Sequence, residues 1–201
     1  MRRLTTADYR RMPWRNGGGT TTELVIGPPS AALSAADAAA DAGADAGADA
    51  GERFLYRVSI ADVASDGPFS RFPGYDRHIM LLDGAGMTLD CGPHGRIDLR
   101  APFEPWAFSG DWDVAGALVD GAVRDFNLMV DRARATSSLE VERLEGPRSF
   151  ACAAHETCIV HVIEGGLDGG AQGDSLVASA PFQLVPQTIT RVVIARIALL
   201  P

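Results

Sequence analysis

The stretch RFLYRVSIADV, residues 53–63, decides the fold class. β-Branched and aromatic residues are frequent in it, and such residues are typical of β-strands. Successive side chains of a strand point to opposite faces of its sheet. From Tyr56 onward, one face of the stretch is therefore apolar, and the other face carries Arg57 and Ser59. We expect a strand with one core-facing side and one polar side.

Similar short runs follow one another along the rest of the chain. They are about four to ten residues long and are bounded by Gly, Pro and Asp, as strands and their turns are. The runs cover residues 20–26, 76–84, 85–91, 95–102, 113–120, 123–130, 157–166 and 188–200. Amphipathic helical patterns are almost absent outside the first dozen residues and one Ala-rich segment, so parallel strands would lack their crossover helices. The sequence predicts an antiparallel all-β fold, either a barrel or a sandwich.

Three consecutive glycines, Gly17 to Gly19, stand in the sequence WRNGGGTTTEL of residues 14–24. A phosphate-binding P-loop needs a strand before its glycines, a Lys-Ser/Thr pair after them and then a helix. Here no lysine follows, and TTTELVI has the pattern of a strand. We interpret the glycines as a tight corner or bulge at the start of that strand, where the backbone can pass close to another segment or a ligand.

The composition excludes several classes of function. The chain of 201 residues is 46% hydrophobic and 22% charged, with a formal net charge of −8. Nucleic acids and anionic membrane surfaces attract clusters of Lys and Arg, which are missing here. No apolar run is long enough to cross a membrane, and the N-terminal residues lack the apolar core of a secretion signal. Three cysteines, an odd number, favour free thiols over a disulfide framework. We expect a cytoplasmic protein without nucleic-acid or membrane partners.

Residues 30–51 differ from the rest of the chain. They consist almost wholly of Ala, Asp and Gly, with a DAGA repeat. Such a segment cannot bury enough apolar area to offset the entropy cost of ordering it. We interpret it as a low-complexity, disordered loop inserted between two strands, in which the first half can form a short Ala-rich helix.

Three blocks of the sequence resemble a known family. MPWRNGGGTTTEL, YRVSIADVASDGPFSRFPGYDRHIMLLDGAGMTL and GAVRDFNLMVDR stand in this order between about residues 12 and 134. They closely resemble the HutD/Ves family of bacterial cupin-like proteins, whereas the last third of the chain has no matching block. The resemblance implies a cupin-like (RmlC-like) double-stranded β-helix barrel. It further implies a bicupin arrangement in a single unit, residues 1–201, with approximate halves 1–110 and 111–201, and a regulatory or accessory role in bacterial histidine utilisation.

Polar residues of two strands are the first candidates for a ligand site. Arg57 and Ser59 share one face of their strand, and Asp125 and Asn127 share the polar face of residues 123–130. If both faces point into a barrel, a guanidinium, a hydroxyl, a carboxylate and an amide converge there. If they point to solvent, they are ordinary surface residues, as is common in antiparallel sheets.

Arg77 is a further candidate, because it opens a strand after the turns of GPFSRFPGYDRH, residues 67–78. It either supplies a second guanidinium fork for a small carboxylate or forms a surface ion pair beside Asp76. The complete set of proposed ligand-binding residues is Asn16, Thr20, Thr22, Glu23, Arg57, Ser59, Arg77, Asp125 and Asn127.

The four histidines lack the spacing of the metal-binding cupin signature, so the resemblance implies a cupin without metal or other cofactor. The run CAAHETCIVH offers a rival zinc site made of Cys152, His155, Cys158 and His161. Within a strand, however, positions three apart point to opposite faces, which would separate Cys158 from His161. We therefore expect no metal.

These expectations favour a binding protein over an enzyme. The expected ligand is a small anionic metabolite, urocanate or a formyl- or formimino-glutamate. The pathway comes from the resemblance, and the anion preference comes from the arginines. The alternative is a metal-free isomerase or hydrolase that uses Glu23 or Asp125 as a general base. A third class, a structural partner protein, would bind no such ligand, and homo-oligomerisation stays open.

Overall fold

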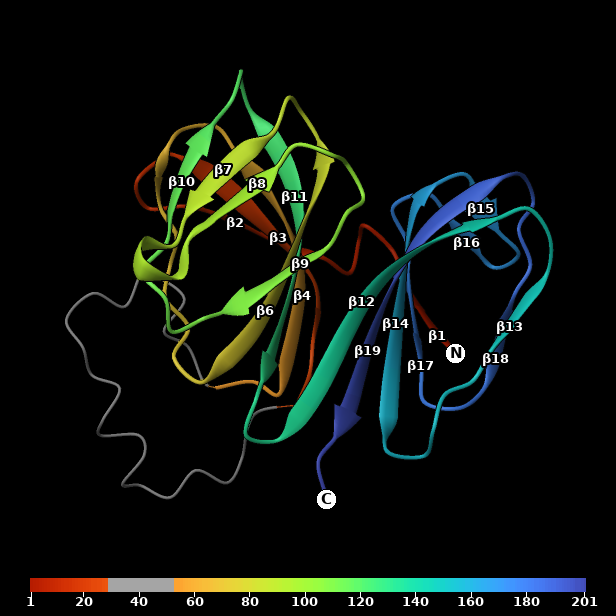
Figure 1. Ribbon diagram of the computed structural model, residues 1–201. Helices are drawn as coiled ribbons and strands as arrows, with labels where there is room; N and C mark the ends of the chain where they lie inside the picture. Colours follow the sequence, from red (N-terminus) through yellow and green to blue (C-terminus); the bar gives the residue numbers. More distant parts are fainter. Residues whose placement is uncertain (29–52) are drawn as a thin grey trace. The chain divides into compact units, whose positions relative to one another are not determined.

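The fold is all-β. The computed structural model describes residues 1–28 and 53–201, and Figure 1 follows the chain through these ranges. Within them the chain forms strands and one short 3-10 helix, η1 (Gly92–His94), but no α-helix. No helix in these ranges has the length and apolar character that a membrane span requires. The predicted all-β fold is confirmed, and the Ala/Asp/Gly segment at 30–51 lies outside the described residues.

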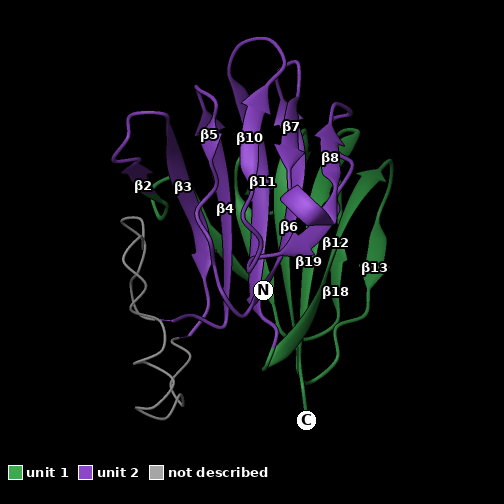
Figure 2. Ribbon diagram, turned by 60° about the vertical axis from the view of Figure 1, so that its left-hand side comes forward, with its two compact units in different colours: residues 1–10, 133–201 green, residues 11–132 purple. Residues whose placement is uncertain are grey.

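The chain divides into two compact units, which Figure 2 distinguishes by colour. Unit 1 comprises residues 1–10 and 133–201, and unit 2 comprises residues 11–132. Each unit has its own sheets and its own buried hydrophobic cluster.

Unit 2 contains a six-stranded and a four-stranded sheet. The larger sheet has the strand order β2-β3-β4-β11-β6-β9, and the smaller sheet has the order β5-β10-β7-β8. The strands are β2 (Arg10–Pro13), β3 (Gly19–Ile26), β4 (Tyr56–Val63), β5 (Gly67–Pro68), β6 (Tyr75–Asp83), β7 (Met87–Asp90), β8 (Arg96–Leu99), β9 (Trp106–Ser109), β10 (Ala115–Leu118) and β11 (Val123–Asp131).

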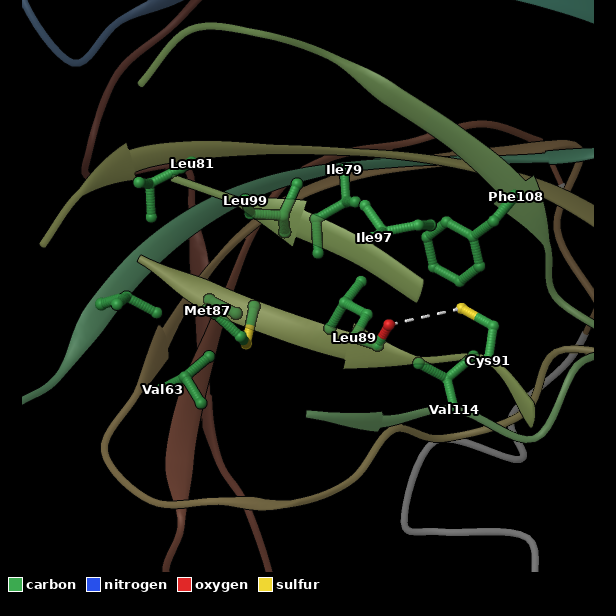
Figure 3. Close-up of a cluster of buried hydrophobic side chains, with 12 residues drawn as sticks. Val63, Ile79, Leu81, Met87, Leu89, Cys91, Ile97, Leu99, Phe108 and Val114 are labelled. Carbon is green, nitrogen blue, oxygen red and sulfur yellow. Dashed lines mark hydrogen bonds between the residues drawn. The ribbon is translucent and has the colours of Figure 1, made fainter. Parts of the chain in front are cut away.

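The two sheets of unit 2 share one hydrophobic core, which Figure 3 shows in close-up. Ile79 and Leu81 of β6 come from the larger sheet, and Met87 and Leu89 of β7 come from the smaller sheet. All four side chains are fully buried, and burial of such side chains is the main term that stabilises two sheets packed face to face. The face of the larger sheet that carries Ile79 and Leu81 is called the inner face of unit 2 below.

Unit 1 is built on a five-stranded sheet of order β1-β17-β14-β19-β12, with two further strand pairs, β13-β18 and β15-β16. Its strands are β1 (Arg2–Leu4), β12 (Ala135–Leu144), β13 (Arg148–Phe150), β14 (Glu156–Glu164), β15 (Gly166–Leu167), β16 (Gly170–Ala171), β17 (Ser175–Ala178), β18 (Phe182–Leu184) and β19 (Thr190–Leu199). Val160 and Val162 of β14 pack with Val192 and Ile194 of β19 in its core. These residues define the inner face of unit 1.

Some parts of this topology differ from the sequence-based expectation because long-range pairing overrides local pattern. The helical tendency expected in the first dozen residues is wrong, since β1 pairs there with β17 from the far end of the chain. The ten residues of β12, ATSSLEVERL, were not expected to form a strand, yet they pair with β19 along its whole length. The approximate halves 1–110 and 111–201 stay a prediction. In the division into compact units, β11 belongs to residues 11–132 because it pairs on both sides with β4 and β6.

Candidate functional site

The polar face of β4 is part of the inner face of unit 2. Ala61 and Val63, which share their face of β4 with Arg57 and Ser59, belong to the hydrophobic core between the two sheets. Both faces of β4 are buried, since Val58 of the opposite face is also fully inaccessible to solvent. Arg57 and Ser59 are therefore interior residues and not the solvent-facing residues of a half-exposed sheet.

The register of β11 brings a second polar pair beside the first. Asp125 lies opposite Ala61 of β4, and Asn127 lies opposite Ser59. On its other side, β11 pairs with β6, where Asn127 lies opposite Ile79 of the core. The polar residues expected on these two strands thus share one face, and they are buried there.

Arg77 occupies the same face from the third strand. Met129 of β11 lies opposite Arg57 on one side and opposite Arg77 on the other. The two arginines are therefore separated by one strand, which corresponds to about 9–10 Å between their backbones. Arg77 is only 4% exposed and Arg57 only 3%, so neither is a surface residue.

A hydrogen-bonded chain runs from Arg77 to Asp125. The Arg77 Nη2 donates to Asn127 Oδ1 at 3.0 Å, and the Asn127 Nδ2 in turn donates to Asp125 Oδ1. The Arg77 Nη1 donates to the backbone carbonyl of Ser70 at 3.2 Å. Within residues 1–28 and 53–201, the buried Arg77 Nε and Asp125 Oδ2 have no hydrogen-bond partner. This series of hydrogen bonds thus has a donor, Arg77 Nε, at one end and an acceptor, Asp125 Oδ2, at the other, and both can form a further hydrogen bond.

Three aromatic rings surround the Arg77 guanidinium. Its central carbon lies 4.8 Å from the ring centroid of Phe108, 5.5 Å from that of Phe72 and 5.7 Å from that of Phe69. Cation–π attraction over ring faces offsets part of the cost of burying the charge. The rings also place apolar surface directly beside a cation.

Arg57 is held by a carboxylate from β3. The Arg57 Nε lies 3.0 Å from Glu23 Oε2, and the Glu23 side chain is 14% exposed. The register of β3 against β4 shifts between Glu23 and Val25. Such a bulge bends a strand locally and re-aims its side chains. The irregularity therefore marks the position where β3 supplies the counter-charge of Arg57.

Burial changes the proton affinity of the charged groups on this face. Desolvation raises the pKa of Asp125 to about 7, although the nearby Arg77 and the hydrogen bond from Asn127 act in the opposite direction. Desolvation also lowers the pKa of Arg77 to about 10, and repulsion by Arg57 adds to this effect. The raised pKa weakens the negative charge of Asp125 near neutral pH, so this carboxyl group offsets less of the positive charge of the buried arginines. Arg57 and Arg77 together outweigh Glu23 and the weakened charge of Asp125, so these four groups have a net positive charge.

Other residues of the proposed set lie elsewhere. Thr20 and Thr22 lie opposite Asp62 and Ile60 of β4, so they project from the face opposite to Glu23. The Asn16 Oδ1 accepts a hydrogen bond from the backbone N–H of Gly18 at 2.9 Å and shapes the turn between β2 and β3. The structure therefore brings together Glu23, Arg57, Ser59, Arg77, Asp125 and Asn127, and it separates Asn16, Thr20 and Thr22 from them.

The glycine run is the tight corner that the sequence predicted. Gly17 has a φ of +72°, and the Trp14 backbone N–H donates to the Gly19 carbonyl at 2.9 Å across the turn. A Cβ atom on Gly19 would lie 2.5 Å from the carbonyl oxygen of Asp62, so only glycine fits against β4. The strand β3 and not a helix follows, which agrees with the rejection of a P-loop.

The environment of Arg77 contains groups that sequence reasoning did not include. Phe69, Phe72 and the Ser70 carbonyl belong to the block GPFSRFPGYDRH, where alternating aromatic and polar residues were a usable signal. Phe108 comes from β9, which was not expected as a strand. The rival reading of an Arg77–Asp76 surface pair is wrong, because Asp76 lies next to Arg132 at 3.1 Å and Arg77 is buried.

The Cys/His run behaves as its strand geometry predicts. Cys158 shares the inner face of unit 1 with Val160, whereas His161 contacts Ser175 through its Nδ1 at 3.0 Å and lies on the opposite face. His155 is exposed. The four residues of the run therefore do not converge.

Comparison with known proteins agrees with this fold. The model of the family described as HutD matches residues 6–192. An uncharacterised 21.2 kDa protein from the hutC 3′ region of Pseudomonas putida is 39% identical over 139 residues, which are 68% of this chain and 62% of that protein. Protein Ves of Cronobacter sakazakii is 34% identical over 162 residues, which are 79% of this chain and 75% of Ves.

Two solved structures extend the comparison to three dimensions. HutD from Pseudomonas fluorescens SBW25, described for a formate condition, is 29% identical with a TM-score of 0.75, and the match covers 100% of this chain and 99% of that one. The oxalate decarboxylase of Lactobacillus farciminis has a TM-score of 0.61 at 9% identity over 98% of this chain and 85% of that chain. The second likeness concerns the fold alone, which is cupin-like.

Proposed function

This chain belongs to the HutD family, and from that premise we propose that it is a small-molecule-binding accessory or regulatory protein of histidine utilisation. Its ligand is an anionic intermediate of that pathway, urocanate or a formyl- or formimino-glutamate. The anion binds on the inner face of unit 2, at Arg57 and Arg77, without a metal ion at that site.

The observation that carries this proposal is the burial of two arginines on one face. Burying a guanidinium is costly unless it is paired and hydrogen-bonded. Arg57 has Glu23 beside it, whereas Arg77 directly contacts a neutral amide oxygen, a backbone carbonyl and three rings, and its nearby carboxyl group, Asp125, has a raised pKa. A carboxylate is the ligand that a guanidinium fork binds best, through two parallel hydrogen bonds. The surplus positive charge of this face supports an anion as the missing partner.

The aromatic rings beside Arg77 support a carboxylate attached to a carbon skeleton. Phe69, Phe72 and Phe108 offer apolar and polarizable surface next to the cation. The imidazole ring of urocanate or the methylene groups of a substituted glutamate would contact such surface favourably. Phosphate and sulfate would gain only the electrostatic part of this interaction.

The relatives support the pathway. One matched protein is named for the hutC 3′ region, and a solved relative is named HutD and described for a formate condition. Formate is the smallest carboxylate, so it is a natural probe for the arginine site of this chain.

A thermal-shift screen followed by calorimetric titration tests the proposal. The compounds are urocanate, formyl-glutamate, formimino-glutamate and formate, with histidine as the zwitterionic control. We expect one of the three intermediates to raise the melting temperature and to bind saturably, and formate to bind more weakly at the same site. If no carboxylate of this set shifts the melting temperature, the proposed function is wrong.

The alternative function, a metal-free isomerase or hydrolase, is favoured by one observation. Asp125 is buried with a pKa near 7, and a general base works best when its pKa lies near the operating pH. Glu23, the other candidate base, is paired with Arg57 and is therefore the weaker of the two. Incubating the protein with each intermediate and following its consumption distinguishes the two functions, because only an enzyme turns its ligand over. Turnover that is lost in Asp125→Asn would establish the alternative.

A further inference from the structure

A second polar cluster lies in unit 1, on the inner face of its sheet. Glu156, Cys158 and Val160 lie on the same face of β14. Cys152 lies in the segment between β13 and β14. One ligand atom from each of Cys152, Glu156 and Cys158 can be chosen so that all three lie within 4.8 Å of one another. Among the described residues, this is the group of three His, Cys, Asp or Glu residues whose ligand atoms lie close enough together to hold one metal ion.

We propose that Cys152, Glu156 and Cys158 form a binding site for a thiophilic divalent cation such as Zn²⁺. Two thiolates and one carboxylate are ordinary zinc ligands. In tetrahedral coordination with Zn–S bonds of about 2.3 Å, two sulfur atoms lie about 3.8 Å apart. The ligand atoms therefore need to close by only about 1 Å, a shift that side-chain rotation supplies.

The surroundings of the two thiols favour a stable site. Cys158 is fully inaccessible to solvent, and Cys152 is 5% exposed. Both belong to a small hydrophobic cluster with Ala178 and Phe182. Apolar surroundings of this kind limit solvent access and strengthen the attraction between a cation and its thiolates.

Arg196 occupies the position that the cation would compete for. It lies opposite Cys158 in the register of β14 and β19. Its Nη1 lies 3.5 Å from the Cys158 Sγ and 3.3 Å from Glu156 Oε1, and it donates to the Ala151 carbonyl at 2.9 Å. The guanidinium thus forms an ion pair with Glu156, and a bound cation would have to displace it. This competition predicts that removing the charge of Arg196 strengthens metal binding.

The site differs from the one that the sequence run suggested. That run offered Cys152 and Cys158 together with His155 and His161, and the histidines lie elsewhere. Glu156, two residues before Cys158 on the same face, takes their place. The expectation of no metal was based on the histidines, so it did not weigh this set of ligands. The inference is independent of the anion site in unit 2.

Titration of the full-length, reduced protein with Co²⁺ tests the proposal, because thiolate ligation gives cobalt strong near-ultraviolet absorption. We expect about one Co²⁺ per chain, with release of thiol protons and displacement by Zn²⁺. Cys158→Ala should abolish the absorption, and Glu156→Gln should weaken cobalt binding about tenfold or more. Arg196→Gln should bind Co²⁺ more tightly than the wild type.

Cys91→Ala is the matched control. Cys91 is a buried thiol of unit 2, where its Sγ contacts the Leu89 carbonyl in the core shown in Figure 3, and its removal should leave cobalt binding unchanged. Circular dichroism establishes whether each variant is folded. If Cys158→Ala does not fold, the cobalt affinity of Glu156→Gln tests the proposal instead. Absence of thiolate–cobalt absorption in the wild type, or its persistence in Cys158→Ala, would overturn the proposal. If diamide joins Cys152 to Cys158 in a disulfide while the reduced protein takes up no Co²⁺, the pair is a redox couple and the metal site is wrong.

Discussion

The inner faces of the two units are built from the same kind of antiparallel strand, but the centre of one face is charged and the centre of the other is apolar. In unit 2, the neighbouring strands β4, β11 and β6 place Arg57, Asp125 and Arg77 inside the fold. In unit 1, the neighbouring strands β14 and β19 fill the corresponding face with Val160 and Ile194. The backbone pattern is shared, so the chemical difference between the two faces resides in a few inward positions of each sheet.

The comparison also shows how a fold can hold charge where apolar packing would be more stable. A face of aliphatic residues stabilises its unit through burial alone. A face with buried charges is stable only if each charge has a partner, and such faces are retained where they bind or react. The proposed anion site therefore lies in unit 2, whereas Val160 and Ile194 of unit 1 stabilise their sheet through burial.

The largest expected effect is that of Asp125 on the pH dependence of the unfolding free energy. Its pKa is raised to about 7 by burial, so between about pH 4 and pH 7 the folded state holds a proton that the unfolded state releases. Since the folded state binds more protons, this group lowers the free energy of unfolding as pH rises through that window, by up to roughly 4 kcal/mol. Asp125→Asn is neutral at every pH and should remove this component. Denaturant unfolding at several pH values measures the difference between variant and wild type.

Asp98→Asn is the control for this experiment. Asp98 is an exposed carboxylate whose pKa is lowered by its hydrogen bond from Thr88. The stability that it contributes is lost only as the pH falls below about 4, so its removal should leave the pH dependence of the unfolding free energy between about pH 4 and pH 7 unchanged. Parallel pH profiles for Asp125→Asn and the wild type would contradict a protonated Asp125. Burial is the main cause of the raised Asp125 pKa; Arg77 and the hydrogen bond from Asn127 oppose it, and Asp62 adds to it.

Arg57 gives the next largest effect, and it concerns binding. Arg57→Ala should cost about 2–4 kcal/mol of ligand binding, or roughly 30- to 1,000-fold in affinity, by analogy with truncation of one member of a buried charge pair. Arg57→Lys should recover only part of the loss, because an ammonium keeps the charge but not the fork. Calorimetric titration with the best ligand of the screen measures both variants.

Arg124→Ala is the matched control for Arg57→Ala. Arg124 lies on β11 in the same unit, but its side chain is half exposed and pairs with Asp62 at the surface, where such pairs contribute little. We expect wild-type affinity for this variant. A folded Arg57→Ala protein that binds within threefold of the wild type would remove Arg57 from the site and leave Arg77 as the main anion-binding group.

The sequence predicted the polar pairs of unit 2 because alternation is a local property. Tyr56 to Ala61 and Asp125 to Val130 both alternate, and the structure places the polar members of both on one face. The same rule argues against grouping Thr22 with Glu23, since neighbours along a strand point to opposite faces. The predicted set of site residues contained both Thr22 and Glu23, although alternation places only one of them on a given face.

The sequence predicted Arg77 as a candidate, but its contacts with other strands and loops depend on the folded chain. The Phe108 ring, the Ser70 carbonyl and the Asn127 amide come from different strands and loops and meet only in the folded chain. The cluster of Cys152, Glu156 and Cys158 is similar, because Cys152 lies outside β14 and reaches it through a turn. Register and tertiary packing decide such clusters, and a single sequence leaves both open.

Val160→Ala tests the expected stabilising role of the apolar face of unit 1. Val160 is fully buried at the centre of β14, so the loss of two methyl groups should lower the free energy of unfolding by about 1–3 kcal/mol. Ligand affinity should not change at temperatures where the variant is folded. Denaturant unfolding and ligand titration of the same preparation separate the two effects. A loss of affinity as large as that of Arg57→Ala would show that the apolar face of unit 1 takes part in binding.

The smallest effect is expected from the Ala/Asp/Gly segment, which joins β3 to β4 in the unit that carries the proposed site. Replacing Ala35 to Ala50 with a short Gly/Ser linker should leave the melting temperature within a few degrees. The strand ends on either side are already tied together, because the Gly27 N–H donates to the Tyr56 carbonyl at 2.8 Å and the Leu55 N–H donates to the Pro28 carbonyl at 3.0 Å. Loop-closure entropy grows only with the logarithm of loop length, so the shorter connection changes stability by less than about 1 kcal/mol. Thermal unfolding with and without the ligand measures both consequences: a fall of more than about 10 °C would show that the segment packs on unit 2, and an unchanged melting temperature with a tenfold loss of affinity would make it part of the site.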